Sequence, residues 1–227
     1  MRHLYDAANR AKPFYSSADQ MPHSAVNPPP PIANEEDFPE HDEEYQSMST
    51  KSEFLESCGI YYLCSDITFR SVSDCIEWIL VHNLQPEPLE ELTLIITSLG
   101  GLVDASFSLT DMMEGSSIPI KTVGLGTISS CGLLIFMAGA KGHRILTENT
   151  SILSHTHAGG NFGKSHELVA SIRHNDLTSE KIMKHYKKHT GLSEKQIKSK
   201  LLTPSDVWLT AKEAKELKIC DEIRLNK

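Results

Sequence analysis

The sequence lacks the features that mark a membrane or secreted protein. No apolar run approaches the roughly 18 residues that a membrane-spanning helix needs. The N-terminal segment has no apolar core of the kind found in signal peptides, because charged residues and prolines recur in it. We therefore expect no membrane partner, and we expect the protein to be soluble and cytoplasmic.

Cysteine is scarce, and positive charge is not in excess. Five scattered cysteines, an odd number, predict reduced and packed thiols rather than a disulfide framework. The formal charge of −8 is uneven: nine acidic against three basic residues give −6 in residues 1–50, and 21 against 19 give −2 in residues 51–227. No part of residues 51–227 is basic enough to suggest nucleic acid as a partner.

The first 50 residues have little that can form a core. They hold seven of the eleven prolines, including the run Pro28–Pro31, and an acidic run over residues 35–44. Such a composition buries too little apolar surface to offset the entropy of ordering it. We predict a disordered or cleaved extension over residues 1–52 and a folded domain over residues 53–227. A propeptide or a partner-binding tail is the functional alternative for the extension.

From Gly59 onward, apolar strands alternate with helical patterns. Residues 92–97 form a nearly continuous apolar run, typical of a strand buried on both faces. Strand, glycine-rich turn and helix recur, which predicts an α/β fold of right-handed crossover units. The expected strands cover about residues 60–63, 92–97, 118–123, 144–147, 151–155 and 220–225. The expected helices cover about residues 72–83, 103–113, a buried run after residue 131, residues 165–188, and two short helices opened by the capping boxes Ser193–Gln196 and Thr210–Glu213.

The most informative stretch is GLGTISSCGLLIFMAGAKGHR, from Gly124 to Arg144. Two glycines predict a tight exit from a strand, and Ser129 and Ser130 then precede a buried apolar helix. A serine at a helix N-terminus commonly caps the helix. The unpaired N–H groups and the helix dipole at that point also stabilise an oxyanion, so a catalytic serine is the alternative.

Five motifs together resemble those of ClpP, the proteolytic subunit of Clp protease. The serine-x-glycine at Ser130 and the following AGAKGHR resemble its nucleophile region. In order along the chain, further matches are TSLGG at residues 97–101 to SPGG, ILSHTHAGG at 152–160 to IHQPxGG, HTG at 189–191 to HTG, and DVWLTAKEA at 206–214 to DxFLSAxEA. The resemblance covers about residues 58–225. It implies a ClpP/crotonase-like spiral of repeated β-β-α units with a protruding strand-helix handle at residues 158–188.

The resemblance also implies a catalytic Ser-His-Asp triad. Ser130 matches the nucleophile, His155 the base and Asp206 the orienting acid. Gly101 and Cys131 match the residues whose backbone N–H groups form the oxyanion hole. An imidazole takes the hydroxyl proton in such a site, and a carboxylate orients the imidazole.

Alternatives exist for each position. Ser129 and His157 are the neighbouring candidates for nucleophile and base, the Cys131 thiol is a third nucleophile, and Asp206 lies in a predicted loop where it can serve as a helix cap. The pair His155 and His157 has no third metal ligand at the usual spacing, so no metal is expected. Asp206 aligns with the acid of the ClpP triad only if this chain has two more residues between HTG and Trp208 than ClpP has. Without these two residues, Pro204 would align with the acid. Leu99 replaces the proline of SPGG, and Cys131 replaces a methionine.

The implied function is that of an ATP-dependent serine endopeptidase without metal or organic cofactor. ClpP resemblance implies a homo-oligomer of stacked heptameric rings that hydrolyses unfolded polypeptides inside a chamber. A partner AAA+ unfoldase would deliver the chains and consume the ATP. The ClpP N-terminal segment is not recognisable here, which leaves docking of an unfoldase in question. Alternatives are an inactive subunit of a mixed ring, a processing peptidase independent of an unfoldase, and an acyl-CoA enzyme of the crotonase type.

Overall fold

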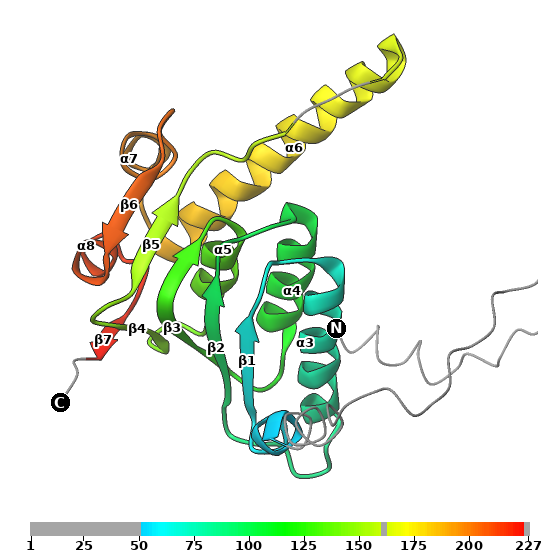
Figure 1. Cartoon of the computed structure of the whole chain (residues 1–227), viewed down its shortest axis with the longest axis vertical. Coiled ribbons are helices and arrows are strands. Elements are labelled where there is room, and N and C mark those ends of the chain that lie inside the picture. The colour runs from blue at the N-terminus through cyan, green and yellow to red at the C-terminus, as the bar shows by residue number, and fades with distance from the viewer. Residues whose placement is uncertain (1–50, 160–162, 225–227) are drawn as a thin grey trace, which may run out of the picture. The chain divides into compact units, whose positions relative to one another are not determined.

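A mostly parallel sheet with helices packed against it forms the framework of residues 51–159 and 163–224, the part of the chain that the computed structural model describes (Figure 1). The sheet strands are β1 (Ile60–Cys64), β2 (Leu92–Ser98), β3 (Ile120–Ser129), β4 (Arg144–Thr147), β5 (Ser151–Ser154), β6 (Val207–Thr210) and β7 (Glu222–Arg224). The helices are α3 (Phe69–Asn83), α4 (Val103–Gly115), α5 (Cys131–Met137), α6 (Ser165–Thr190), α7 (Glu194–Lys200) and α8 (Ala211–Glu216), and residues 51–57 are also helical.

The strand order confirms the predicted α/β crossover architecture. Strands β1, β2, β3, β4 and β7 lie side by side in that order, and all four pairs are parallel. Helix α3 connects β1 to β2, and α4 connects β2 to β3. Strand β5 instead pairs in parallel with the far end of β3, and β6 pairs antiparallel with β5. The sheet therefore branches near the end of β3.

The two glycines of β3 do not end the strand, so the predicted tight exit is wrong. Gly124 and Gly126 lie inside β3, and Gly126 has a left-handed φ of 60° at a register shift against β2. Before this bulge, residues 122–124 pair with β4; after it, residues 127–129 pair with β5. The bulge thus redirects the end of β3 to a new partner.

The core lies on one face of the sheet. Along β2, Leu92, Leu94 and Ile96 are fully buried, whereas Thr93 and Ile95 are only partly buried. The prediction of a strand buried on both faces is therefore wrong. Apolar residues on the second face of β2 made the run look continuous in the sequence.

Helix α5 is enclosed on all sides. All seven of its residues are buried, as expected from the apolar run after Ser130. The long helix α6 contrasts with it, because its N-terminal half extends away from the sheet (Figure 1) and exposes Val169 and Ile172. Both predicted capping boxes are present, at the start of α7 and of α8.

The predicted extension lies outside the described residues up to residue 50. Its last two positions, 51 and 52, are helical. In the handle region, residues 155–159 and 163 contain no strand, and residues 160–162 are outside the described part. Among the described helices, none combines the length and hydropathy that crossing a bilayer requires.

Candidate active site

Ser130 has a backbone conformation that serine rarely adopts. Its φ of 55° and ψ of −118° match the first central position of a type II′ turn, where a side chain is strained and glycine is favoured. Ser130 stands at the N-cap position of α5, but its hydroxyl makes no capping hydrogen bond. The interpretation of Ser130 as a simple helix cap is therefore wrong. Strain of this kind costs about 1–3 kcal/mol and is concentrated at functional sites.

The preceding serine differs in accessibility. Ser129 is 1% exposed at the end of β3, and its Oγ has no hydrogen-bond partner among the described residues. Ser130 is only partly buried, and its N–H group donates to the Leu153 carbonyl oxygen at 2.9 Å. Of the two adjacent hydroxyls, only that of Ser130 is placed to meet a substrate.

A glycine loop packs directly on Ser130. A Cβ added to Gly100 would lie 2.7 Å from the Ser130 Cβ, and one added to Gly101 would lie 2.2 Å from the Ile67 carbonyl oxygen. Both glycines also have left-handed φ values, of 107° and 151°. Neither the Gly101 nor the Cys131 N–H group donates to a backbone carbonyl oxygen outside the described helices and strands, although the backbone of both residues hydrogen-bonds the Cys131 thiol. The backbone amides of the glycine loop and of the start of α5 therefore border the Ser130 position.

The sheet register brings the other two predicted triad residues to the same corner. Ser129 pairs with Leu153 on β5, two residues before His155. Across the antiparallel β5–β6 pair, Ser154 is opposite Val207. Since His155 follows Ser154 and Asp206 precedes Val207, both residues leave the paired strands at the same end. Ser130, His155 and Asp206 thus lie at the adjoining ends of β3, β5 and β6.

This combination of a strained serine after a strand, a glycine loop and a neighbouring histidine and aspartate agrees with a comparison to known families. The sequence matches the family described as Clp protease over residues 42–227. The chain belongs to the Clp protease family. The ClpP resemblance is thereby confirmed, and the α/β fold is of the ClpP/crotonase-like type. The protein is accordingly a hydrolase, a peptidase of the ClpP type.

One element of this Clp protease was not expected. The residues around Asp206 were predicted to be a loop entering a helix, but Val207–Thr210 form β6, and Asp206 directly precedes that strand. Thr210 then caps α8 through its hydroxyl, which accepts from the Glu213 N–H group. The short strand has polar flanks and an exposed Trp208, so its apolar pattern is weak. Asp206 is therefore not the cap of α8.

In this Clp protease the thiol beside Ser130 is buried and hydrogen-bonded to the glycine loop. The Cys131 side chain is 1% exposed, and its Sγ donates to the Gly101 carbonyl oxygen at 3.1 Å. Burial raises the pKa of this thiol, although hydrogen bonds that it accepts from the Ser106 and Ser130 side chains and from the backbone of Gly101 and Cys131 oppose the shift. A protonated, buried thiol is a poor nucleophile. The cysteine instead fixes the glycine loop against the start of α5.

The three candidate side chains are close in register but not linked. Among the described residues, no hydrogen bond joins the side chains of Ser130, His155 and Asp206. His155 is partly buried and Asp206 is exposed, and the alternative base, His157, is partly buried as well. Neither histidine belongs to a three-residue cluster of metal-ligand side chains in the described part.

A buried polar brace behind His155 was missed in the sequence. The Ser154 hydroxyl shares a 2.8 Å hydrogen bond with the Tyr186 hydroxyl on α6, and it donates to the Leu201 carbonyl oxygen at 2.8 Å. Burial raises the pKa of Tyr186 to about 12, so the phenol stays protonated. The available signal was a serine inside an apolar strand directly before the candidate base. The brace fixes the end of β5 against α6.

Proposed function

We propose that the chain is a serine endopeptidase with Ser130 as nucleophile, His155 as general base and Asp206 as the orienting acid. The observation that carries the proposal is the strained conformation of Ser130 beside a tightly packed glycine loop. A residue held in such a conformation without a capping role fits a group presented for reaction. The convergence of β3, β5 and β6 supports the assignment of the other two residues.

The proposed reaction is acyl transfer in two stages. The Ser130 Oγ attacks the peptide carbonyl carbon while His155 takes the hydroxyl proton. His155 then gives this proton to the leaving amine as the C–N bond breaks, which leaves an acyl ester on Ser130. A water molecule, deprotonated by His155, then attacks the ester, which releases the acid product and regenerates free Ser130. Asp206 holds the imidazole in the right tautomer and stabilises its charged form.

The oxyanion formed in each stage needs donors that are already in place. The N–H groups of Gly101 and Cys131 are the donors we propose, because both border Ser130 and neither bonds a carbonyl oxygen outside the described helices and strands. Removing one such donor costs about 10²–10³ in kcat in serine proteases. The bond from the Cys131 thiol to the Gly101 carbonyl keeps the two donors together.

Binding of a substrate or assembly of subunits has to bring the three side chains into contact. In apo enzymes, catalytic hydrogen bonds are often long and tighten only in the complex. The partial exposure of His155 and the exposure of Asp206 leave both side chains free to rotate. No metal or organic cofactor takes part in the proposed steps, since every proton and bond is handled by the chain and water.

The proposed setting is a chamber built from rings of subunits. Members of the Clp protease family generally form oligomeric rings. The projecting half of α6 exposes Val169 and Ile172, which suits burial against a second subunit. We propose stacked heptameric rings, an AAA+ unfoldase as the partner that consumes ATP, and unfolded polypeptides as substrates.

The central test compares wild-type protein with the Ser130→Ala and Ser129→Ala variants. We expect a fluorophosphonate probe to label wild type and Ser129→Ala at Ser130, and to leave Ser130→Ala unlabelled. Cleavage of a fluorogenic peptide should fall by at least about 10³-fold in Ser130→Ala. Peptide cleavage by Ser130→Ala at the wild-type rate would rule out the mechanism.

The base is tested by a matched pair. His155→Asn should lose activity to the same degree as Ser130→Ala, whereas His157→Asn should keep at least a tenth of it. The two substitutions lie in the same backbone segment, one on each side of Thr156, so each serves as the control for the other. The reverse ranking would make His157 the base.

The unlinked triad side chains favour one competing function, that of an inactive subunit in a mixed ring. Labelling of the purified, unmixed protein at Ser130 contradicts this alternative, and absence of labelling in an assembled ring supports it. Mass measurement of the same particle reports the number of subunits. Degradation of a folded substrate only with ATP and a Clp unfoldase would separate the chamber protease from a processing peptidase that works alone.

A further inference from the structure

A second group of reactive side chains lies where the C-terminal ends of α4 and α6 meet. His185 and His189 are four residues apart on α6 and therefore share one face of the helix. Glu114 stands near the end of α4. One possible ligand atom from each of the three residues lies within 4.8 Å of the other two. Two imidazoles and a carboxylate form a ligand set typical of zinc.

His185 is prepared for such a role by its hydrogen bond. Its Nε2 lies 2.8 Å from the Leu134 carbonyl oxygen on α5. A carbonyl oxygen only accepts, so Nε2 carries the proton and Nδ1 keeps its lone pair. Metal-binding histidines usually donate their second N–H group in this way, which fixes the ring.

Glu114 and His189 are already in contact. The His189 Nε2 lies 3.0 Å from the Glu114 Oε1, and Lys188 Nζ lies 2.5 Å from the Glu114 Oε2. The Lys188 side chain is more than half exposed, so it can leave the carboxylate when a cation arrives. The nearby Arg144 charge is compensated, because its guanidinium forms two hydrogen bonds with Asp221.

The cluster has access to solvent. A surface cavity of about 880 Å³ is lined by Glu114 and His189, and also by Lys188, Thr190 and Gly191. This opening provides a route for an ion and room for a water molecule as a fourth ligand. His185 forms the closed side of the cluster, since it is 6% exposed.

We propose that Glu114, His185 and His189 bind a divalent transition-metal ion of the zinc type, with water as the fourth ligand. The ion would tie α4 to α6 beside the buried helix α5. The ion takes no part in the Ser130 reaction, because its ligands lie near the C-terminal ends of α4 and α6, whereas Ser130 lies at the N-terminus of α5. Two imidazoles favour zinc, cobalt, nickel or copper over magnesium and calcium, which prefer oxygen ligands.

The proposal is tested by titrating the chelator-treated full-length protein with zinc chloride against a chromophoric competitor. We expect one tight site per chain, and a rise of at least about 5 °C in the unfolding temperature at a hundredfold excess over Kd. Cobalt at this site should give the intense visible absorption of four-coordinate Co²⁺.

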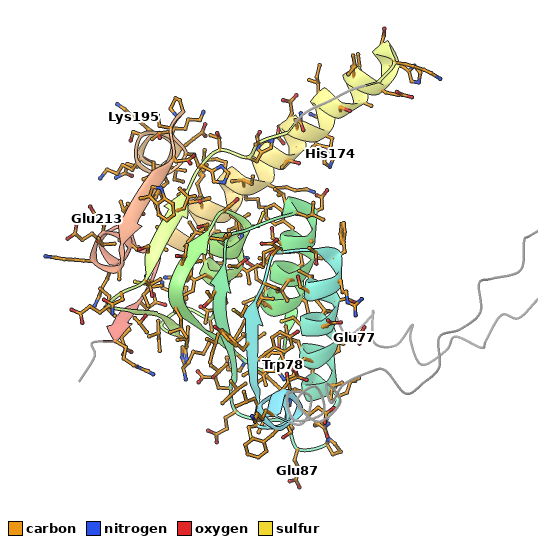
Figure 2. All side chains as sticks on the ribbon, in the orientation of Figure 1. Glu77, Trp78, Glu87, His174, Lys195 and Glu213 are labelled. Carbon is orange, nitrogen blue, oxygen red and sulfur yellow. The ribbon has the colours of Figure 1, made fainter. Side chains whose placement is uncertain are left out.

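Three variants separate this site from other histidines. Glu114→Gln and His189→Gln change partly exposed side chains and should each weaken zinc binding at least tenfold and remove the cobalt absorption. His174→Gln is the matched control: His174, labelled on α6 in Figure 2, faces Asp104 of α4 at 3.5 Å and should leave binding unchanged. Unchanged zinc affinity in both Glu114→Gln and His189→Gln would overturn the proposal. So would the absence of binding by wild type at 100 µM zinc, a concentration roughly a thousandfold above the dissociation constant expected of such a site.

Discussion

Two histidine-bearing regions lie around α5, and they are built in opposite ways. At its start, the corner of Ser130, His155 and Asp206 contains no hydrogen bond between these side chains. Beside its later residues, the junction formed by Glu114, Arg144, His185, His189 and Asp221 is fastened by several short hydrogen bonds. The three side chains of the corner are not bonded to one another, whereas those of the junction are, and a metal ion bound there would replace the contacts of Glu114 with Lys188 and His189.

The difference also appears in the backbone. Ser130 holds a strained conformation, while the junction residues on α6 are regular helix ended by Gly191 in the left-handed conformation that suits a C-cap. Strain at one site and satisfied bonding at the other are expected if the first acts on a substrate and the second secures the fold. Substitutions at the corner should therefore lower activity and leave stability unchanged, whereas substitutions at the junction should lower stability.

The largest effect is expected for Asp206→Asn at the corner. Loss of the carboxylate leaves the imidazole in the wrong tautomer, so kcat should fall about 10²–10⁴-fold. The unfolding temperature should not change, because Asp206 is exposed. Glu216→Gln, another exposed acid, is the control for a change of charge. A destabilised Asp206→Asn protein with normal activity would place Asp206 among the structural residues and break the comparison.

At the junction, Asp221→Asn should cost about 3 kcal/mol of unfolding free energy, because it leaves the buried Arg144 guanidinium unpaired. Burial alone would raise the pKa of Asp221, but hydrogen bonds and charge from Arg144 prevail and hold it below its usual 3.8. The carboxylate therefore stabilises the fold above pH 3.8, and this contribution is lost as the pH falls further.

Urea unfolding at pH 7 and at pH 3 measures both effects of Asp221→Asn. The exposed pair of Lys198 and Glu194 supplies the control, since Lys198→Gln should change stability by less than about 0.5 kcal/mol. Equal stability of wild type and Asp221→Asn at pH 7 contradicts the assignment.

A smaller effect is expected from the buried imidazole of His185. Burial lowers its pKa from 6.5 to about 4, so the unfolded chain takes up the proton first as the pH falls. Wild type should therefore lose about 1–3 kcal/mol of stability between pH 6.5 and pH 4. His185→Gln, which keeps a donor for the Leu134 carbonyl, should lose less over this range. Parallel pH profiles for the two proteins would show that His185 does not titrate there.

The smallest expected effect is a gain. Ser130→Gly should raise the unfolding free energy by about 0.5–1 kcal/mol relative to Ser130→Ala, because glycine relieves the strain at φ 55° while adding its own entropy cost. Both variants are inactive in the proposed mechanism, so activity does not confound the comparison. Thermal unfolding measures the difference. A Ser130→Gly protein less stable than Ser130→Ala would show that the backbone at residue 130 is not strained.

Much of the framework followed from the sequence. The helices with a clear apolar stripe or capping box, such as α3, α7 and α8, lie where their patterns predict them. The buried run of α5 was equally clear. Strand β6 was missed because its four residues alternate weakly and include an exposed tryptophan. The β3 bulge was missed because a glycine signals a turn and a bulge alike.

The candidate site was only partly visible in the sequence. Motif resemblance singled out Ser130, but the strain at this residue is a property of the backbone and leaves no compositional trace. The Glu114, His185 and His189 cluster was missed since the three residues are 75 positions apart at most, and only the packing of α4 beside α6 joins them. Pairing between distant segments is what periodicity cannot supply.

The complete burial of α5 makes Ser130 the most fixed of the three residues in the proposed triad. Ser130 directly precedes a helix whose seven residues are all buried, so the proposed nucleophile has almost no freedom to shift without disturbing the fold. Adjustment falls to the short antiparallel pair of β5 and β6, two four-residue strands that end next to His155 and Asp206. In the proposed mechanism, a small shift of this strand pair would therefore change the activity of the protein without changing its stability.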